Sequence, residues 1–296
     1  MIVRCLLAAL IALTPSMWLE ADAPPRASTA QTPAAPRRIV SLVPSITEVL
    51  FAIGAGDAVI GVSSFDHYPR EVESRAKVGG LIDPDFERIL ALRPDLVIVY
   101  GTQTPITERL ARARIPVFTF QHSGLAEVTR LMRELGARTG HAATANARAT
   151  EIERRIADIR AKTSSRPRPK TMMVFERETG SLRGMFGSGG SGFLHDMIEA
   201  GGGANVFADV ARESIQITTE QVLAKAPDVI LEFRSGPEWT AAHALREREP
   251  WRTLASVPAV RNNRVHILTD EMLSIPGPRV ADAILAIAKV LHPEVF

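Results

Sequence analysis

The feature that limits the fold most is a segment that occurs twice. The two copies are Glu87 to Ile98 (ERILALRPDLVI) and Glu220 to Leu231 (EQVLAKAPDVIL). Each copy begins with a glutamate that opens a short helix, continues through a Pro-Asp pair that ends the helix, and finishes in a buried strand. A chain that carries the same helix–strand unit in each half is most simply folded as two lobes of similar plan.

Strand-like and helix-like segments alternate throughout both halves. The expected strands of the first half are 39–43, 59–62, 96–100 and 117–120, with helices over 45–52, 86–92, 106–113 and 125–139. The second half repeats the alternation, with strands over 172–176, 229–233 and 265–268 and helices over 193–200 and 279–291. Such alternation predicts an α/β fold in which each Rossmann-like lobe is built on a central, mostly parallel sheet.

A different pattern lies between the halves. Small and branched apolar residues recur there at intervals of three and four, at Ala142, Ala145, Ala149, Ile152, Ile156 and Ile159. This spacing is typical of one face of a helix, which from His141 to Lys162 would be about 33 Å long. That length bridges two lobes, although a helix packed within one lobe has the same pattern. We expect an N-terminal lobe over 38–140, an interlobe helix over 141–163 and a C-terminal lobe over 164–296.

The N-terminus has the pattern of a secretory signal peptide. Arg4 precedes an apolar run from Cys5 to Leu13, and small residues follow at Ala21 and Ala23. The run is too short to span a membrane, and this order of charge, apolar core and small residues is found in signal peptides. A buried N-terminal helix is the alternative. We expect removal of residues 1–23, a flexible Pro/Ala-rich leader over 24–37, and a periplasmic protein. The single cysteine lies in the signal, so the mature chain would depend on packing rather than disulfides.

Charge and catalytic motifs indicate neither a nucleic-acid partner nor an enzyme. The formal net charge is +2, without a basic block that would attract a phosphate backbone. The glycine-rich run 187–192 lacks the lysine and hydroxyl of a phosphate-binding loop. A tight turn into the next helix is the better interpretation, and its N–H groups could still line a cleft. Neither G-x-S-x-G nor H-E-x-x-H occurs. We expect no catalytic residue and no cofactor; an exported hydrolase is the rival class.

Several segments together resemble a known family. They are residues 38–48 (RIVSLVPSITE), 61–69 (GVSSFDHYP), the two repeats, and 276–279 (PGPR). In this order they resemble the helical-backbone (class III) solute-binding proteins of bacterial ABC importers for iron complexes, haem and cobalamin, and residues 61–69 are most similar to the cobalamin-binding members. The resemblance implies a monomer with two lobes joined by one long helix, and a metal-chelate ligand held in the cleft between the lobes with little closure.

The resemblance also implies a role for the repeated glutamates. In the family, one carboxylate on each lobe docks into arginine pockets of a two-fold symmetric permease, which works with an ATPase. The matching positions here are Glu87 and Glu220. A pseudo-two-fold protein presents equivalent charges to equivalent sites, and Arg–carboxylate pairs set orientation and association rate. The alternative is that both glutamates only interact favourably with their helix dipoles.

Ligand-binding residues are expected on both lobes. By resemblance to the cobalamin-binding members, Phe65 contacts the ring of the ligand, and Leu81 and Tyr100 face the cleft. From the other lobe, the resemblance implies contacts by the loop Asp270, Glu271, Met272, Leu273 and Ser274. Relatives often have tryptophan where this chain has Leu81 and Tyr100. An apolar platform with a few polar groups suits a large, amphipathic corrinoid such as cobalamin.

Two other ligands remain open alternatives. Haem is commonly ligated by tyrosine or histidine in this family, and the candidates are Tyr68, Tyr100, His67 and His122. An anionic ferric siderophore needs cationic groups, and the candidates are Arg177, Arg183, Arg234 and Arg279. A bare metal ion needs three or four converging ligands. The histidines are scattered along the sequence, so we expect no resident metal site.

Overall fold

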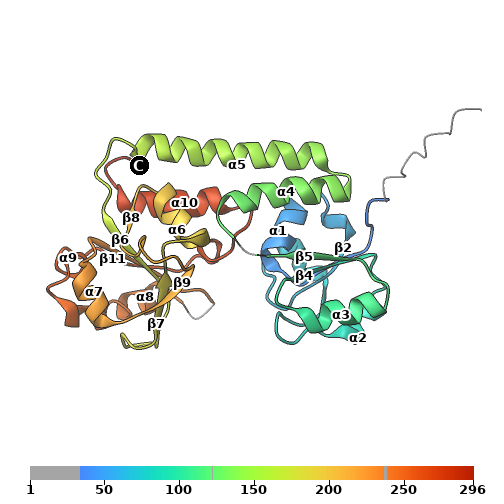
Figure 1. Ribbon diagram of the computed structural model, residues 1–296, viewed down its shortest axis with the longest axis horizontal. Coiled ribbons are helices and arrows are strands. Elements are labelled where there is room, and N and C mark those ends of the chain that lie inside the picture. The colour runs from blue at the N-terminus through green and yellow to red at the C-terminus, as the bar shows by residue number, and fades with distance from the viewer. Residues whose placement is uncertain (1–33, 122, 237–238) are drawn as a thin grey trace, which may run out of the picture. The chain divides into compact units, whose positions relative to one another are not determined.

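The computed structural model describes residues 34–121, 123–236 and 239–296. The expected signal peptide, most of the expected leader and His122 lie outside these residues. Residues 35–296 form one unit, in which each half of the chain has its own sheet (Figure 1).

The N-terminal lobe is a parallel sheet with helices on both faces. Its strands are β1 (Ile39–Ser41), β2 (Val59–Val62), β3 (Ala76–Lys77), β4 (Leu96–Tyr100) and β5 (Val117–Phe120), in the order β3-β2-β1-β4-β5. Helices α1 (Pro44–Ala52) and α4 (Ala126–Thr139) cover one face, and α2 (Phe86–Ala91) and α3 (Thr104–Arg112) cover the other. Successive strand residues point to opposite faces. Ile98 therefore packs with the first pair of helices and Val99 with the second, which explains the unbroken apolar run of β4.

The C-terminal lobe has a mixed sheet. Its strands are β6 (Lys170–Glu176), β7 (Met185–Ser188), β8 (Ala204–Asn205), β9 (Ser214–Ile217), β10 (Val229–Phe233) and β11 (Val265–Leu268). The order is β11-β10-β6-β7-β9, and β8 pairs with β6. Strands β6, β8, β10 and β11 pair in parallel, whereas β7 pairs antiparallel with β6 and β9. The helices are α6 (Gly192–Ala200), α7 (Thr219–Lys225), α8 (Ala241–Arg246), α9 (Pro258–Arg261) and α10 (Val280–Leu291).

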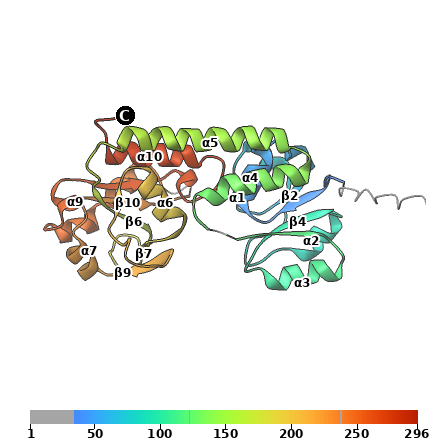
Figure 2. The ribbon, with the colours of Figure 1, turned by 45° about the horizontal axis from the view of Figure 1, so that its top comes forward.

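A single long helix, α5 (Ala142–Thr163), connects the lobes. It packs against α4 of the first lobe and α10 of the second, and Figures 1 and 2 both show it beside these two helices. Of its predicted apolar face, Ala142 in the first turn is exposed, and the other residues are buried, namely Ala145, Ala149, Ile152, Ile156 and Ile159. A Cβ on Gly136 of α4 would lie 2.2 Å from the Cβ of Ala145, so small residues allow α4 and α5 to approach closely. No described helix is long and apolar enough to cross a membrane.

The repeated segment forms the same unit in both lobes, α2–β4 and α7–β10. In each copy the aspartate of the Pro-Asp pair ties the new strand to its neighbour. The Asp95 carboxylate accepts hydrogen bonds from the N–H groups of Arg37 (2.8 Å) and Arg38 (2.9 Å), just before β1. The Asp228 carboxylate accepts one from the N–H of Lys170 (3.0 Å), at the start of β6. The two copies therefore share both the order of their elements and the contact made by their aspartate. The prediction of two Rossmann-like lobes joined by one helix is confirmed.

Candidate ligand cleft

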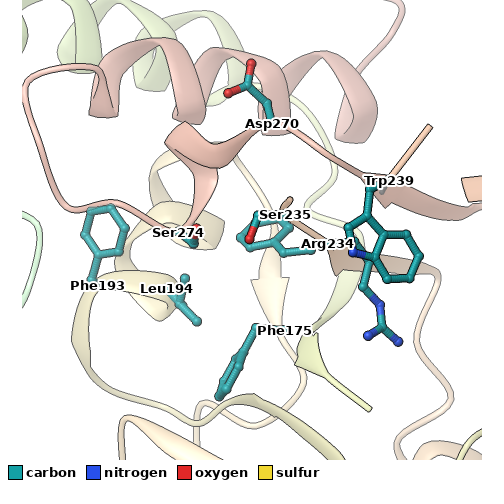
Figure 3. A pocket seen from close by; sticks show the side chains of 9 residues that line it. Phe175, Phe193, Leu194, Arg234, Ser235, Trp239, Asp270 and Ser274 are labelled. Carbon is teal, nitrogen blue, oxygen red and sulfur yellow. The ribbon is translucent and has the colours of Figure 1, made fainter. Parts of the chain in front are cut away.

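Two pockets adjoin at the loop after β11. A pocket of about 330 Å³ is lined by Leu81, Tyr100 and Phe120 of the N-terminal lobe and by Ser274 of the C-terminal lobe. A second pocket, of about 370 Å³, lies on the C-terminal lobe, and its lining residues Phe175, Phe193, Trp239, Arg234, Asp270 and Ser274 are shown in Figure 3. Ser274 lines both pockets. Side chains of both lobes can therefore contact one ligand that extends across the two.

The N-terminal wall is held by a buried glutamine. Gln103 is 5% exposed. Its side-chain oxygen accepts a hydrogen bond from the N–H of Tyr100 at 2.8 Å, and its side-chain nitrogen donates one to the carbonyl of Leu81 at 2.8 Å. The Tyr100 ring meets Phe120 edge to face, with centroids 5.4 Å apart. Because these contacts fix Leu81, Tyr100 and Phe120 relative to one another, this wall is formed before any ligand arrives.

An apolar rim continues from this wall. Phe65 is 65% exposed and Ile82 is 95% exposed. A Cβ on Gly80 would lie 2.5 Å from the Phe65 ring, so the ring rests on this glycine, next to Leu81 in the sequence. Phe65 is not among the residues that line the two pockets. Phe65 therefore lies at the rim of the cleft, and its contact with a ligand stays a prediction.

The loop from 270 to 274 contributes less than the family resemblance implies. Asp270 and Ser274 line the C-terminal pocket. Leu273, in contrast, is 2% exposed and belongs to the hydrophobic core, and Met272 packs against that core. The short 3-10 helix at Glu271–Leu273 turns these side chains inward after Asp270 caps it, by accepting a hydrogen bond from the N–H of Met272 (3.0 Å). Glu271 is half-buried and lines neither pocket, so the loop offers the pockets the Asp270 carboxylate and the Ser274 hydroxyl.

Three aromatic side chains of the cleft that the sequence interpretation missed follow a simple rule. Phe120 ends β5, Phe233 ends β10, and Phe175 is near the end of β6. Ligands of parallel α/β sheets bind outside the carboxyl ends of the strands. The last aromatic residue of each expected strand was therefore the signal that would have identified them. Trp239 lies in the segment after β10 and has no such signal.

A buried ion network lies behind the C-terminal pocket. Arg177 donates to Glu232 at 3.1 Å and pairs with Glu247 at 2.8 Å, and Arg234 donates to Glu232 at 2.7 Å. The Arg234 guanidinium also lies 4.9 Å from the centre of the Trp239 ring (Figure 3). Of the four candidate cations for a siderophore, Arg234 alone is among the pocket-lining residues of the cleft, and Arg177 is engaged inside the lobe.

An ion pair across the lobes fixes the place of Arg279, a candidate for siderophore binding, and of its neighbour Tyr68, a candidate for haem binding. Arg279 precedes α10, and its Nε and Nη2 donate to the two carboxylate oxygens of Glu48 in α1, at 2.9 and 2.6 Å. The same guanidinium lies 4.1 Å from the centre of the Tyr68 ring. These residues line a separate pocket beside α5, not the cleft. Tyr68 and Arg279 are thus placed together away from Tyr100, and His67 is exposed.

Asp66 is a buried carboxylate next to the rim residue Phe65. It is 2% exposed, and neither carboxylate oxygen has a hydrogen-bond partner. The hydroxyl of Thr47 donates to the Val43 carbonyl instead, and the Lys77 ammonium donates to the backbone carbonyl of Asp66 at 2.8 Å. Burial raises the pKa of Asp66 to about 6, although Thr47, Lys77 and Ser63 act in the opposite direction. The folded protein therefore keeps a proton on this carboxyl up to about pH 6, whereas the unfolded chain releases it near pH 3.8.

The raised pKa of Asp66 predicts a stability that increases on mild acidification. Between about pH 6 and pH 4 the folded state holds this proton and the unfolded state does not, so the free energy of unfolding gains about 3 kcal/mol from this group as the pH falls. Asp66→Asn should lack the gain, whereas the exposed Asp57→Asn should keep it. Urea unfolding of the three proteins from pH 7 to pH 4 measures the difference. Parallel curves for wild type and Asp66→Asn would contradict the assignment.

The two repeated glutamates are exposed and occupy matching places. Glu87 lies in the first turn of α2 and Glu220 in the first turn of α7. Asp85 caps α2 by accepting from a backbone N–H, and Thr218 and Gln221 form a reciprocal capping box on α7. Because other residues cap both helices, neither glutamate is needed as a cap. Capping therefore does not require either carboxylate, and the contact of Glu87 is instead with Arg109, whose Nη2 lies 3.4 Å from Glu87 Oε1.

The glycine run before α6 is explained by close packing. A Cβ on Gly189 would lie 2.1 Å from the carbonyl oxygen of Arg212, and one on Gly190 would lie 2.4 Å from that of Ala208. The N–H groups of both glycines donate to backbone carbonyls, at 3.1 and 2.7 Å. The amides of Gly189 and Gly190 are therefore engaged within the lobe, and for these two glycines the expectation that the run could line the cleft is corrected. The described part of the chain contains no group of three or more His, Cys, Asp or Glu residues placed to hold a metal ion.

Two α/β lobes, one connecting helix and a cleft with walls from both lobes define a two-lobed solute-binding protein. Residues 39–272 match the family described as "Periplasmic binding protein", and the chain belongs to this family. It is 28% identical over 268 residues to an uncharacterized ABC transporter substrate-binding lipoprotein, YvrC, of Bacillus subtilis, covering 88% of this chain and 82% of the relative.

Relatives with a named ligand are also similar over most of their length. A vitamin B12-binding protein of Vibrio parahaemolyticus is 27% identical over 255 residues, covering 85% of this chain and 88% of the relative. The crystal structure of the periplasmic vitamin B12 binding protein BtuF of Vibrio cholerae matches with a TM-score of 0.75 at 26% identity, covering 88% of this chain and 98% of that structure. The resemblance stated from the sequence is confirmed.

Proposed function

We propose that this protein captures a corrinoid in its cleft and delivers it to the permease of an ABC importer, with no chemical change to the ligand. The observation that carries the proposal is the cleft itself, in which aromatic side chains of both lobes converge on two pockets that share Ser274. The similarity to vitamin B12-binding proteins supports the ligand, and the similarity to an ABC transporter substrate-binding lipoprotein supports the partner.

The division of the cleft suits a large ligand with an apolar face and a polar edge. The N-terminal wall offers Leu81, Tyr100 and Phe120, with Phe65 exposed at the rim. The C-terminal wall adds polar groups, Arg234, Ser235 and Asp270, beside its aromatic side chains. Flat apolar surface provides most of the binding energy in such sites, and a few placed polar groups fix the orientation. A corrinoid matches both requirements.

The proposal also includes export to the periplasm, docking to the permease, and action as a monomer. The signal-peptide pattern of residues 1–23 would direct the chain to the periplasm, where the exposed Glu87 and Glu220 would meet the permease. Charged groups arranged one per lobe favour a partner with two-fold symmetry. The ligand is held by reversible contacts, so we expect neither a resident cofactor nor turnover.

Removing the rim aromatic should weaken corrinoid binding. Phe65→Ala is expected to raise the dissociation constant for cyanocobalamin about tenfold, because an aromatic contact of about 1.4 kcal/mol is lost. Leu245→Ala is a matched control, since Leu245 is 61% exposed and lines neither pocket of the cleft. Isothermal titration calorimetry on the mature protein measures both. Equal affinity in wild type and Phe65→Ala would exclude Phe65 from the ligand site.

The same titration tests the alternative ligands. Haemin and a ferric siderophore are titrated in parallel with cyanocobalamin, and wild type should bind cyanocobalamin most tightly. Preferential binding of haemin would replace the corrinoid by haem, with Tyr100 as the candidate ligand in the cleft wall. Preferential binding of the siderophore would direct attention to Arg234. Hydrolysis of a model ester by purified protein would support the exported hydrolase and contradict a pure binding role.

A further inference from the structure

The two docking glutamates differ in their immediate surroundings. In the N-terminal lobe, Arg109 Nη2 lies 3.4 Å from Glu87 Oε1, and the side chains are 47% and 83% exposed. In the C-terminal lobe, no Lys or Arg of the described residues lies within ion-pair distance of Glu220. Glu220 instead has its pKa lowered, chiefly by its own backbone N–H and by the Thr218 hydroxyl. The same repeated position thus carries a paired carboxylate in one lobe and an unpaired one in the other.

Arg109 is held in place independently of Glu87. It lies on α3, beside α2 in Figures 1 and 2, and its guanidinium carbon is 3.7 Å from the centre of the Phe86 ring. Phe86 is the residue before Glu87 and is half-buried. A guanidinium stacked on an aromatic face gains attraction from the ring and loses little further freedom in forming an ion pair. The cation therefore stays beside Glu87 instead of moving freely in solvent.

From this asymmetry we propose that Arg109 is an internal competitor for the N-terminal docking site. It occupies the carboxylate that an arginine of the permease must bind, so docking at Glu87 requires exchange of one guanidinium for another. Glu220 has no such competitor and presents its full charge. The C-terminal lobe then makes the first and stronger contact, and the N-terminal lobe engages second. This inference rests on the proposed docking role of the two glutamates.

Unequal docking suits a binding protein that must dissociate from the permease after it has delivered its ligand. Two full-strength charge pairs would hold the delivered protein on the permease, whereas an exchangeable pair at one lobe shortens its residence, since affinity differences among related complexes are mostly differences in dissociation rate. Exposed ion pairs are weak. The exchange therefore adjusts affinity without preventing docking.

The experiment compares variants for binding to the permease–ATPase complex that supports uptake with this protein, embedded in lipid nanodiscs, by surface plasmon resonance. Arg109→Gln is expected to tighten binding about two- to fivefold, mostly through slower dissociation. Arg112→Gln is the matched control, because Arg112 is an exposed arginine one turn along α3, and its Nε donates to the backbone carbonyl of Glu108 at 3.4 Å. It removes the same charge and should leave binding nearly unchanged.

A Glu87→Gln background separates the two proposals. If Glu87 docks, Glu87→Gln alone weakens binding, and adding Arg109→Gln to it should give no gain. If Glu87→Gln leaves binding unchanged, the docking role itself fails. If Glu87→Gln weakens binding but Arg109→Gln matches Arg112→Gln, docking stands and Arg109 is not a competitor. Weaker binding of Arg109→Gln would also overturn the proposal, because Arg109 would then orient Glu87 for the permease.

Discussion

Replacing Arg279 with alanine is expected to lower the free energy of unfolding by about 3–5 kcal/mol at neutral pH, because it leaves a buried carboxylate without its partner. The Glu48 side chain is 2% exposed, and both its oxygens accept hydrogen bonds from Arg279. Burial raises the pKa of Glu48 even with the arginine in place. Without the guanidinium this pKa rises further, and the variant must fold either with an unpaired charge or with an added proton.

The pH dependence of the Arg279→Ala variant follows from the same carboxylate. A carboxyl group with a raised folded-state pKa destabilises the protein above that pKa, and the penalty falls as the pH decreases. The deficit relative to wild type should therefore be largest at pH 8 and smaller at pH 5. Arg155→Ala provides the control, since its ion pair with Asp282 is 33% and 49% exposed and should cost at most about 1 kcal/mol. Urea unfolding at the two pH values measures both variants. A deficit for Arg279→Ala no larger than that for Arg155→Ala would show that the pair is not structural.

This ion pair also marks where the sequence was informative and where it was not. Both partners lie in segments that carry the family resemblance, residues 38–48 and 276–279. Their pairing was not predicted, however, because more than two hundred residues separate them and no local spacing brings them together. The helix α5 was predicted nearly to its ends, since its apolar period is local. Local patterns predict elements, whereas contacts between lobes depend on the tertiary fold.

The residues of the cleft can also be divided into those that the sequence predicted correctly and those that it did not. Leu81, Tyr100, Asp270 and Ser274 were predicted through the resemblance, and they line the pockets. Leu273 was predicted by the same alignment but is buried, because the 3-10 helix Glu271–Leu273 turns its side chain into the core. The strands β7 and β9 were not predicted either. Each has four residues, and neither shows the unbroken apolar run by which the buried parallel strands were recognised. Side-chain direction and short antiparallel strands are the features that sequence periodicity defines least.

Removing both docking glutamates should have the largest effect on function. Glu87→Ala combined with Glu220→Ala is expected to lower uptake of cyanocobalamin about 100-fold or more at limiting protein, because two charge-assisted hydrogen bonds of about 1.5–3 kcal/mol each would be lost at the permease. Ligand affinity should be unchanged, since neither residue lines the cleft. Folding should also persist, because Asp85 and Thr218 cap the two helices and the dipole contribution of each glutamate is only about 0.3–1 kcal/mol.

The control for this double variant must remove the same charge elsewhere. Glu73→Ala with Glu249→Ala does so, since both side chains are largely exposed and each pairs only with a nearby arginine. Uptake into cells that express the importer is measured for all three proteins, with cyanocobalamin affinity determined on the purified chains. Loss of uptake in both double variants would indicate a general charge effect, and normal uptake without Glu87 and Glu220 would refute docking by the repeated carboxylates. Loss confined to the docking pair would mean that the repeat serves two purposes, with its aspartates holding each sheet together and its glutamates presenting each lobe to the permease.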